Sequence, residues 1–238
     1  MADAERLAFE QMLVHNLKAP LTGIMASLEM LHDGDLGELS ATQRAAIGAM
    51  QAQGVELVQM IDELLELGRT ESSTFAVQTV PLDPRTFLAG VRGVWAERLP
   101  RLTSDAAPDV PELVADSGTL RRVFDNLLMN AMIHAGPDAT VSMRAERAGD
   151  VVKILVADDG PGIPAEDVDR IFDPFVTLSQ SGARRTHGLG LAYCRAALAA
   201  MDGTIAVVPP PVGGRGATFA IALPAAVVLT RQALEQDQ

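Results

Sequence analysis

The sequence is poor in the features that mark secreted and membrane proteins. Its 238 residues include a single cysteine, Cys194, which excludes an internal disulfide and is typical of a reducing cytosol. No apolar run approaches the ~20 residues that a membrane-spanning helix needs. The N-terminus also lacks the charged and apolar pattern of a signal peptide. We therefore expect a soluble, cytoplasmic protein without a membrane segment in this chain.

Positive charge is scarce as well. The chain has 19 Lys and Arg against 31 Asp and Glu, which gives a formal net charge of -12. Nucleic acids and anionic membranes bind clusters of Lys and Arg, so neither is expected as the main partner. Hydrophobic residues make up 48% of the chain, enough for one moderate core and a smaller element. One or two domains are expected.

Two apolar repeats in the first seventy residues predict a helical hairpin. Between them, residues 33–40 break the pattern with two glycines, and Ser40 is placed to cap the second helix. A hairpin with one long apolar stripe on each arm cannot bury both stripes alone, so we expect a homodimer built as a four-helix bundle. The steps of three and four residues are carried by Val14, Leu17, Leu21, Ile24, Leu28 and Leu31, and then by Ile47, Met50, Gly54, Leu57, Ile61, Leu64 and Gly68.

Strand and helix patterns then alternate, after a short polar linker at residues 72–74. Asp83-Pro84 and Asp116 or Ser117 are typical helix starts. The alternation predicts a two-layer α/β domain over residues 76–224, followed by an uninformative tail at 225–238. The expected strands are 75–82, 140–146, 151–157, 204–208 and 217–223, with a turn at 148–150, and the expected helices run from 84 to 95, from about 117 to 135 and from 190 to 201.

Three groups of polar and glycine residues in this second region suit nucleotide chemistry. Asn126 and Asn130 are one helical turn apart, and an amide oxygen is a suitable ligand for Mg²⁺ held mainly by phosphates. Asp158 ends an apolar strand, where a carboxylate can accept the exocyclic amino hydrogen of adenine. Gly188 and Gly190 precede a helix whose free backbone donors would face phosphate. Each group alone also fits a solvated helix face or an ordinary turn.

Taken together, four sequence boxes in a fixed order resemble those of the sensor histidine kinases. The resemblance implies a helical dimerisation and phosphoacceptor domain at 1–72. It also implies an ATP-binding domain of the Bergerat type, as in gyrase and Hsp90, at 76–224. The phosphoacceptor box corresponds to His15-Asn16-Leu17-Lys18-Ala19-Pro20-Leu21, and the nucleotide boxes correspond to Asn126–Ala131, Asp158–Ile163 and Gly188–Leu191.

The resemblance also implies a role for individual residues. His15 would accept the phosphoryl group from ATP, with Asn16 and Lys18 beside it in the catalytic box, and Asn130 would bind Mg²⁺. Residues 171–175 resemble the family's phenylalanine box, and 177–187 would form a lid over ATP. In that lid Arg184 and Arg185 either reach the terminal phosphate or are simply solvated. The implied ATP-site residues are Asn126, Asn130, His134, Asp158, Gly160, Gly162, Ile163, Arg185, Gly188, Leu189, Gly190, Leu191 and Thr218.

The boxes depart from the family pattern at four positions. Asn16 replaces the usual Glu or Asp and cannot act as a carboxylate base, so slower autophosphorylation is expected. Ala19 replaces a Thr or Asn that positions water, which argues against phosphatase activity. Ile133 replaces a Lys that would contact phosphate, and Thr186 replaces a glycine of the lid.

The implied partner is the receiver domain of a response regulator. Signal input would come from a separate sensory partner or from a sensor region outside this sequence. Two other classes of function remain open. One is a phosphotransfer or scaffold protein with weak or no kinase activity, and the other is an ATPase of the gyrase or mismatch-repair type.

Overall fold

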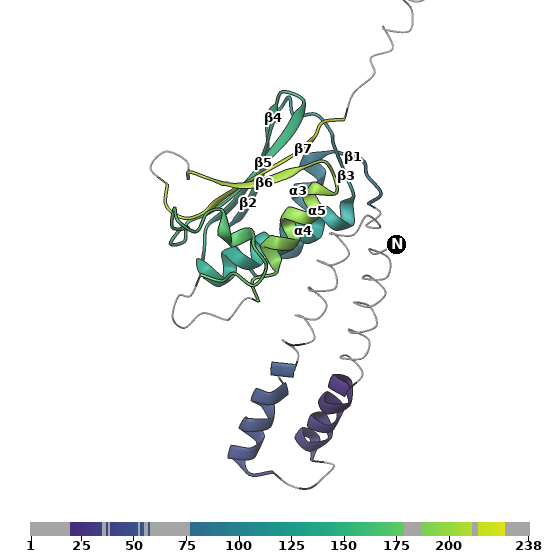
Figure 1. Ribbon diagram of the computed structural model, residues 1–238, viewed down its shortest axis with the longest axis vertical. Helices are drawn as coiled ribbons and strands as arrows, with labels where there is room; N and C mark the ends of the chain where they lie inside the picture. Colours follow the sequence, from purple (N-terminus) through teal and green to yellow (C-terminus); the bar gives the residue numbers. More distant parts are fainter. Residues whose placement is uncertain are drawn as a thin grey trace, which may run out of the picture. The chain divides into compact units, whose positions relative to one another are not determined.

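The structure is a computed structural model of the protein, and the chain divides into two compact units, Met1–Phe75 and Ala76–Gln238 (Figure 1). The described residues are 20–34, 37, 39–51, 53–54, 57, 77–178, 187–210 and 214–226. The predicted residues His15, Asn16, Lys18, Ala19 and Arg184 to Thr186 lie outside them, and their roles stay predictions.

The first unit contains the predicted pair of helical segments, at 20–33 and from 41 to 51. Ser40 caps the second segment as expected. Its Oγ accepts a hydrogen bond from the Gln43 N–H (3.3 Å), and the Gln43 Oε1 accepts one from the Ser40 N–H (2.9 Å). The segments meet closely, because a Cβ at Gly54 would lie 2.1 Å from the Met25 Sδ. Here a side chain of one arm packs on bare backbone of the other.

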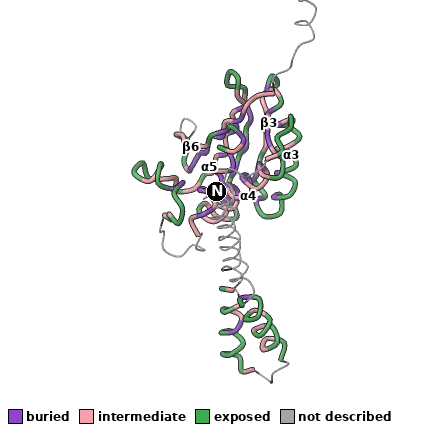
Figure 2. The backbone as a smooth tube through the Cα atoms, turned by 45° about the vertical axis from the view of Figure 1, so that its right-hand side comes forward, coloured by how far each residue is buried: buried purple, intermediate pink, exposed green. Residues whose placement is uncertain are grey.

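The apolar stripes of this unit are only partly covered. Leu21 and Ile47 are buried, but Ile24 and Met50 are 57% and 53% exposed. Figure 2 shows exposed residues along both helical segments. Large apolar side chains exposed in one stripe are unusual for the surface of a stable monomer.

The second unit is built on a mixed five-stranded sheet of order β2-β4-β5-β7-β6 (Figure 1). β2 pairs parallel with β4, and the other neighbours are antiparallel. β1 and β3 form a separate two-stranded sheet. The strands are β1 (Val80–Leu82), β2 (Leu102–Ala106), β3 (Leu113–Ala115), β4 (Val141–Ala148), β5 (Val151–Asp158), β6 (Thr204–Val208) and β7 (Thr218–Pro224).

Three helices cover one face of this sheet, α3 (Pro84–Trp95), α4 (Ser117–His134) and α5 (Gly190–Ala199) (Figure 1). Asp83 caps α3 by accepting from the N–H groups of Arg85 and Thr86. Asp116 caps α4 by accepting from the Thr119 N–H (2.9 Å), and this hydrogen bond lowers the pKa of Asp116. Both predicted helix starts are confirmed.

The core of the second unit lies between the helices and the sheet. Alternate residues of the central strands point into it, so Val152, Ile154 and Val156 are buried. The Trp95 indole is also buried, and its Nε1–H donates to the Asp125 Oδ1 (2.7 Å). Cys194 is fully buried among them, and burial raises the pKa of its thiol. Cys194 is therefore a small packed side chain of the core.

Several predicted boundaries are corrected. Within the expected strand at 75–82, residues 77–79 are not strand and Val80–Leu82 are, and the helix expected to end at 201 ends at Ala199. In its last turn the Met201 N–H bonds back three residues to the Leu198 carbonyl. No strand was expected at β2 or β3. β3 has three residues, too few to show a period, and β2 is an edge strand with polar residues.

Candidate functional site

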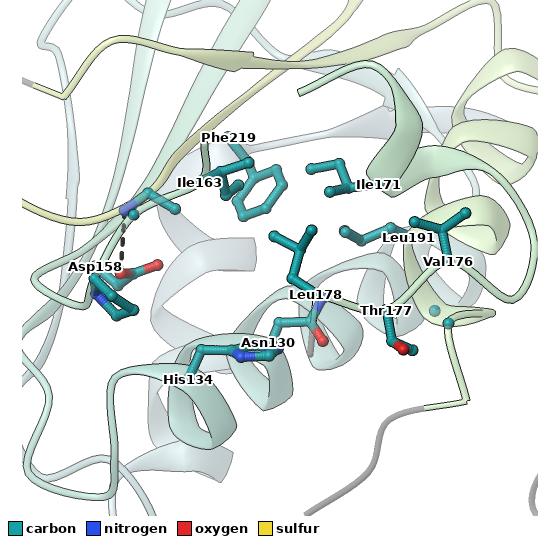
Figure 3. A pocket seen from close by; sticks show the side chains of 15 residues that line it. Asn130, His134, Asp158, Ile163, Ile171, Val176, Thr177, Leu178, Leu191 and Phe219 are labelled. Atoms are coloured by element: carbon teal, nitrogen blue, oxygen red, sulfur yellow. Dashed lines mark hydrogen bonds between the residues drawn. The ribbon is translucent and has the colours of Figure 1, made fainter. Parts of the chain in front are cut away.

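A cavity lies beside α4, at the ends of β5 and β7 and the start of α5 (Figure 3). Its polar side chains, among them Asn130, His134 and Asp158, lie along one side. Its lining comprises Asn130, His134, Asp158, Pro161, Gly162, Ile163, Ile171, Val176, Thr177, Leu178, Gly188, Gly190, Leu191, Ala217 and Phe219.

Asp158, the last residue of β5, is held by backbone on both sides. Its Oδ1 accepts hydrogen bonds from the N–H groups of Gly160 (2.9 Å) and Ala217 (3.2 Å). The Asp158 N–H in turn donates to the Ala217 carbonyl (3.0 Å). With Oδ1 fixed, the carboxylate is oriented at the cavity, and Oδ2 is the oxygen left to accept from a ligand.

Close backbone approaches around Asp158 require glycine. Gly216 has φ +99°, and a Cβ there would lie 1.9 Å from the Asp158 carbonyl oxygen. Gly162 has φ +81°, and its Cβ would lie 3.1 Å from the Gly216 carbonyl oxygen. A side chain at Gly216 would therefore displace the strand end that carries the carboxylate.

The second glycine loop is locked to the segment after the 3-10 helix at Arg170–Phe172. The Phe175 N–H donates to the Gly188 carbonyl (3.0 Å). Gly188 has φ +69°, and a Cβ there would lie 2.7 Å from the backbone of Phe175 and Val176. Phe175 itself has φ +66°, a strained value for a bulky residue. The loop thus fixes Val176 at the cavity wall.

One face of α4 supplies the amides. Asn130 and His134, four residues apart, both project into the cavity (Figure 3). One turn earlier, the Asn126 Oδ1 would lie 2.9 Å from a Cβ at Gly190, so α5 begins against this amide. The Asn126 Nδ2 donates to the Arg122 carbonyl (3.1 Å). Asn126 is therefore part of the contact between α4 and α5, beside the cavity.

The start of α5 has no side-chain cap. Leu189 occupies the capping position and its side chain makes no capping hydrogen bond. The first N–H groups of a helix have no partner within the helix, and they carry the positive end of its dipole. With Gly190 at the cavity, this helix start is suited to an anionic group.

The rest of the cavity wall is apolar. Ile163, Leu178 and Phe219 face one another across it in Figure 3. The Phe219 ring is held from behind by an edge-to-face contact with Phe172, with ring centroids 6.4 Å apart. A flat apolar group enclosed here would have a carboxylate, Asp158, at its edge.

The structure brings most of the described ATP-site residues together. The residues that line the cavity are Asn130, His134, Asp158, Gly162, Ile163, Gly188, Gly190 and Leu191. Asn126 and Gly160 are adjacent to lining residues, and Leu189 is buried in the core. Thr218 does not line the cavity; its strand neighbours Ala217 and Phe219 do. The Thr218 hydroxyl is buried and has no hydrogen-bond partner among the described residues.

Other lining residues were missed at the sequence level. Ile171 and Thr177 belong to segments that the resemblance had singled out, the phenylalanine box and the lid. Leu178 also belongs to the lid, Val176 carries no motif of its own, and Ala217 and Phe219 flank Thr218. For Ala217 and Phe219, strand alternation around Thr218 was the available signal.

Two family models match the chain in consecutive segments. The His Kinase A (phospho-acceptor) domain matches residues 5–73. The histidine kinase-, DNA gyrase B- and HSP90-like ATPase matches residues 115–227, which contain every described residue of the predicted ATP site.

Curated relatives belong to the same family. The adaptive-response sensory kinase SasA of Synechococcus sp. (strain JA-3-3Ab) is 31% identical over 223 residues, covering 90% of this chain and 58% of that protein. The sensor histidine kinase RcsC of Escherichia coli (strain K12) is 31% identical over 231 residues, covering 94% of this chain and 24% of RcsC. The chain thus spans between a quarter and three fifths of these relatives.

Solved structures share the fold. Full-length ShkA in complex with AMPPNP superposes with a TM-score of 0.75 at 28% identity, covering 95% of this chain and 47% of ShkA. Histidine kinase ThkA in complex with the response regulator protein TrrA superposes with a TM-score of 0.64 at 19% identity, covering 94% of this chain and 64% of that chain. Among the described residues, no helix has the length and apolar character to cross a membrane. The resemblance is confirmed: the chain belongs to the histidine kinases and contains their catalytic core, a phosphoacceptor region followed by an ATPase-type domain.

Proposed function

We propose that this chain is an ATP-dependent protein histidine kinase that phosphorylates its own His15 and passes the group to an aspartate of a response regulator. Phosphoacceptor function would belong to residues 1–72 and ATP binding to residues 76–224. The observation that carries the proposal is the fixed Asp158 carboxylate at one end of a cavity whose other end is the uncapped start of α5. That arrangement suits a nucleotide, with its nucleobase at the Asp158 end and its phosphates at the start of α5.

Adenine fits the carboxylate end. The Asp158 Oδ2 would accept a hydrogen bond from the exocyclic amino group of adenine, while guanine presents a carbonyl oxygen there. The apolar side chains of Ile163, Leu178 and Phe219 would enclose the base. We therefore expect selectivity for ATP over GTP.

The phosphates would lie at the start of α5, where Gly188 and Gly190 keep the backbone open to them. Mg²⁺ would be held mainly by phosphate oxygens, with the Asn130 amide oxygen as a protein ligand. Among the described residues, no group of three or more His, Cys, Asp and Glu side chains could hold a metal ion. An amide oxygen that lines the cavity fits a metal brought in with its nucleotide. Bound Mg²⁺ would neutralise charge on the transferring phosphoryl group.

The chemical step would be an in-line displacement. A ring nitrogen of His15 attacks the γ-phosphorus, the bond from phosphorus to the β–γ bridging oxygen breaks, and ADP leaves with that oxygen. Asn16 and Lys18 lie beside the nucleophile in sequence. An amide such as Asn16 would orient the ring but cannot take its proton as a carboxylate would, so the ring proton would be released to water.

We also propose that the chain acts as a homodimer. In the first unit Ile24 and Met50 are more than half exposed, although both belong to the predicted apolar stripes. A second copy would cover them by completing a four-helix bundle.

A scaffold without kinase activity would not need an intact nucleotide cavity. The glycine contacts at Gly162, Gly188 and Gly216 are all present, which favours the kinase over that alternative.

Incubation with γ-labelled ATP and Mg²⁺ tests the proposal. We expect acid-labile label on the wild-type chain and none on His15→Gln, which should bind ATP with unchanged affinity. His32→Gln is the matched control, because His32 lies in the same helical unit, and it should label normally. Label that persists on His15→Gln would remove His15 from the mechanism, and an unlabelled wild type that still binds ATP would favour the scaffold.

A further inference from the structure

Four polar side chains form a row along α4. Arg122, Asn126, Asn130 and His134 are each four residues apart and therefore share one face of the helix. His134 and Asn130 line the cavity, and Asn126 touches the first residue of α5. Arg122 extends the row by one more turn, beyond the cavity.

Two glycine contacts give the direction of a nucleotide along this row. A Cβ at Gly160 would lie 2.8 Å from the Ala135 Cβ, so the Asp158 turn sits at the C-terminal end of α4. A Cβ at Gly190 would lie 2.9 Å from the Asn126 Oδ1, so α5 begins nine residues earlier along α4. At 1.5 Å per residue, these points are about 14 Å apart. With its base at Asp158 and its phosphates at α5, ATP runs toward the N-terminus of α4.

The next group in that direction is the Arg122 guanidinium. It lies over the Tyr193 ring, 4.7 Å from the ring centroid. Tyr193 is in the first turn of α5, three residues after Gly190, and is itself buried. A guanidinium over an aromatic face is attracted by the negative face of the ring. Tyr193 thus acts as a platform for the charge.

The adjacent Arg121 is in a different environment. Its Nε lies 3.2 Å from the Asp125 Oδ1, which also accepts from the Trp95 indole. Arg121 and Arg122 thus carry the same charge but lie on different faces of α4. Only Arg122 belongs to the row that leads from the cavity.

We propose that Arg122 binds the terminal phosphate of ATP and so makes the site prefer ATP over ADP. This inference rests on the proposed ATP-binding function. A guanidinium donates strong, charge-assisted hydrogen bonds to phosphate oxygens. It also neutralises charge on the γ-phosphoryl group as that group passes from the bridging oxygen of ADP to the histidine nitrogen.

The test compares ATP and ADP binding to the full chain with Mg²⁺, by calorimetry. Arg122→Gln should weaken ATP binding about tenfold, which corresponds to ~1.4 kcal/mol, and should change the affinity for ADP less than about threefold. Arg121→Gln is the matched control, since it removes the same charge one residue away. It should change both affinities less than about threefold and by the same factor.

Variants of the platform sharpen the test. Tyr193→Phe keeps the ring and should preserve the ratio of ATP to ADP affinity. Tyr193→Leu removes the aromatic face and should lower that ratio toward the value of Arg122→Gln. Arg122→Lys keeps the charge without the flat fork, and an intermediate ratio is expected. If Arg122→Gln does not fold, Arg122→Lys decides by the same comparison.

The outcomes distinguish this assignment from the proposed function. A wild-type chain that binds neither nucleotide would overturn the ATP site as a whole. A wild-type chain that binds ATP, with Arg122→Gln binding ATP equally well or losing ATP and ADP by the same factor, would overturn the role of Arg122 alone.

Discussion

The two units of the chain differ in how completely each buries its own apolar residues. In the second unit, Phe124, Leu128 and Ile154 are fully buried between the helices and the sheet. In the first unit, Ile24 and Met50 remain more than half exposed on helical segments that should pack. A helix is stabilised mainly by burial of its apolar face. The second unit thus buries a core of its own, whereas the described helical segments of the first unit leave large apolar side chains uncovered.

The units also divide the proposed chemistry. The nucleophile, His15, belongs to the first unit by sequence, and the nucleotide cavity is built wholly from the second. Substitutions in one unit should therefore affect phosphoryl acceptance or ATP binding separately.

The largest effect is expected in the core of the second unit. Phe124→Ala removes a fully buried ring that packs against Phe87, and should cost about 3–5 kcal/mol of unfolding free energy. Ile24→Ala should cost the first unit much less when measured at concentrations below dimer formation. Denaturant unfolding checks both. Equal losses would show that the units do not differ in core burial.

The next effect sharpens the dependence of the first unit on a second copy. The double change Ile24→Ser and Met50→Ser should weaken self-association about a hundredfold or more, because each exposed apolar side chain contributes roughly 1.5 kcal/mol when buried. Sedimentation measures this. Val94→Ser is the matched control, since Val94 is 66% exposed on the second unit and its change should not affect association. A monomeric wild type would contradict the proposed dimer.

A smaller effect is expected at the base end of the cavity. Asp158→Asn should weaken ATP binding about tenfold. If the amide oxygen keeps the two backbone hydrogen bonds, the amide NH₂ group faces the adenine amino group, and two donors then meet. Asp159→Asn is the control; the Asp159 Oδ1 accepts from the Thr140 N–H, away from the cavity lining. Unchanged discrimination between ATP and GTP in Asp158→Asn would mean that the carboxylate does not contact the base.

The smallest effect is expected for restoring the family's residues around His15. Asn16→Glu supplies a proton acceptor and should raise the autophosphorylation rate at saturating ATP, by less than the ~10²-fold of a fully placed base. Adding Ala19→Thr should give measurable dephosphorylation of the regulator. An efficient phosphatase in the wild type, or an Asn16→Glu variant that is no faster, would show that these positions do not control the chemistry.

Local chemistry made the helix starts predictable. Asp83 and Asp116 cap α3 and α4 as expected, because a cap depends only on a side chain and the next few N–H groups. The cavity wall was less accessible to sequence reasoning. Val176 lines it because Gly188 holds its backbone in place, a contact between distant residues that no local pattern encodes.

Strand register limited the prediction in a different way. Thr218 was chosen from its motif, yet Ala217 and Phe219 line the cavity. A shift of one residue in a strand exchanges the two faces of the sheet. The motif therefore located the strand correctly but not the face that serves the site.

The buried indole of Trp95 has a practical consequence for separating the two units. Trp95 and Tyr193 are the chain's sole tryptophan and tyrosine, and both belong to the second unit. Intrinsic fluorescence excited at the indole band therefore reports on that unit alone, while far-ultraviolet circular dichroism records the helices of both. A melt followed by the two signals on the intact chain would resolve one unit from the other optically, with no extrinsic dye and no cut between them.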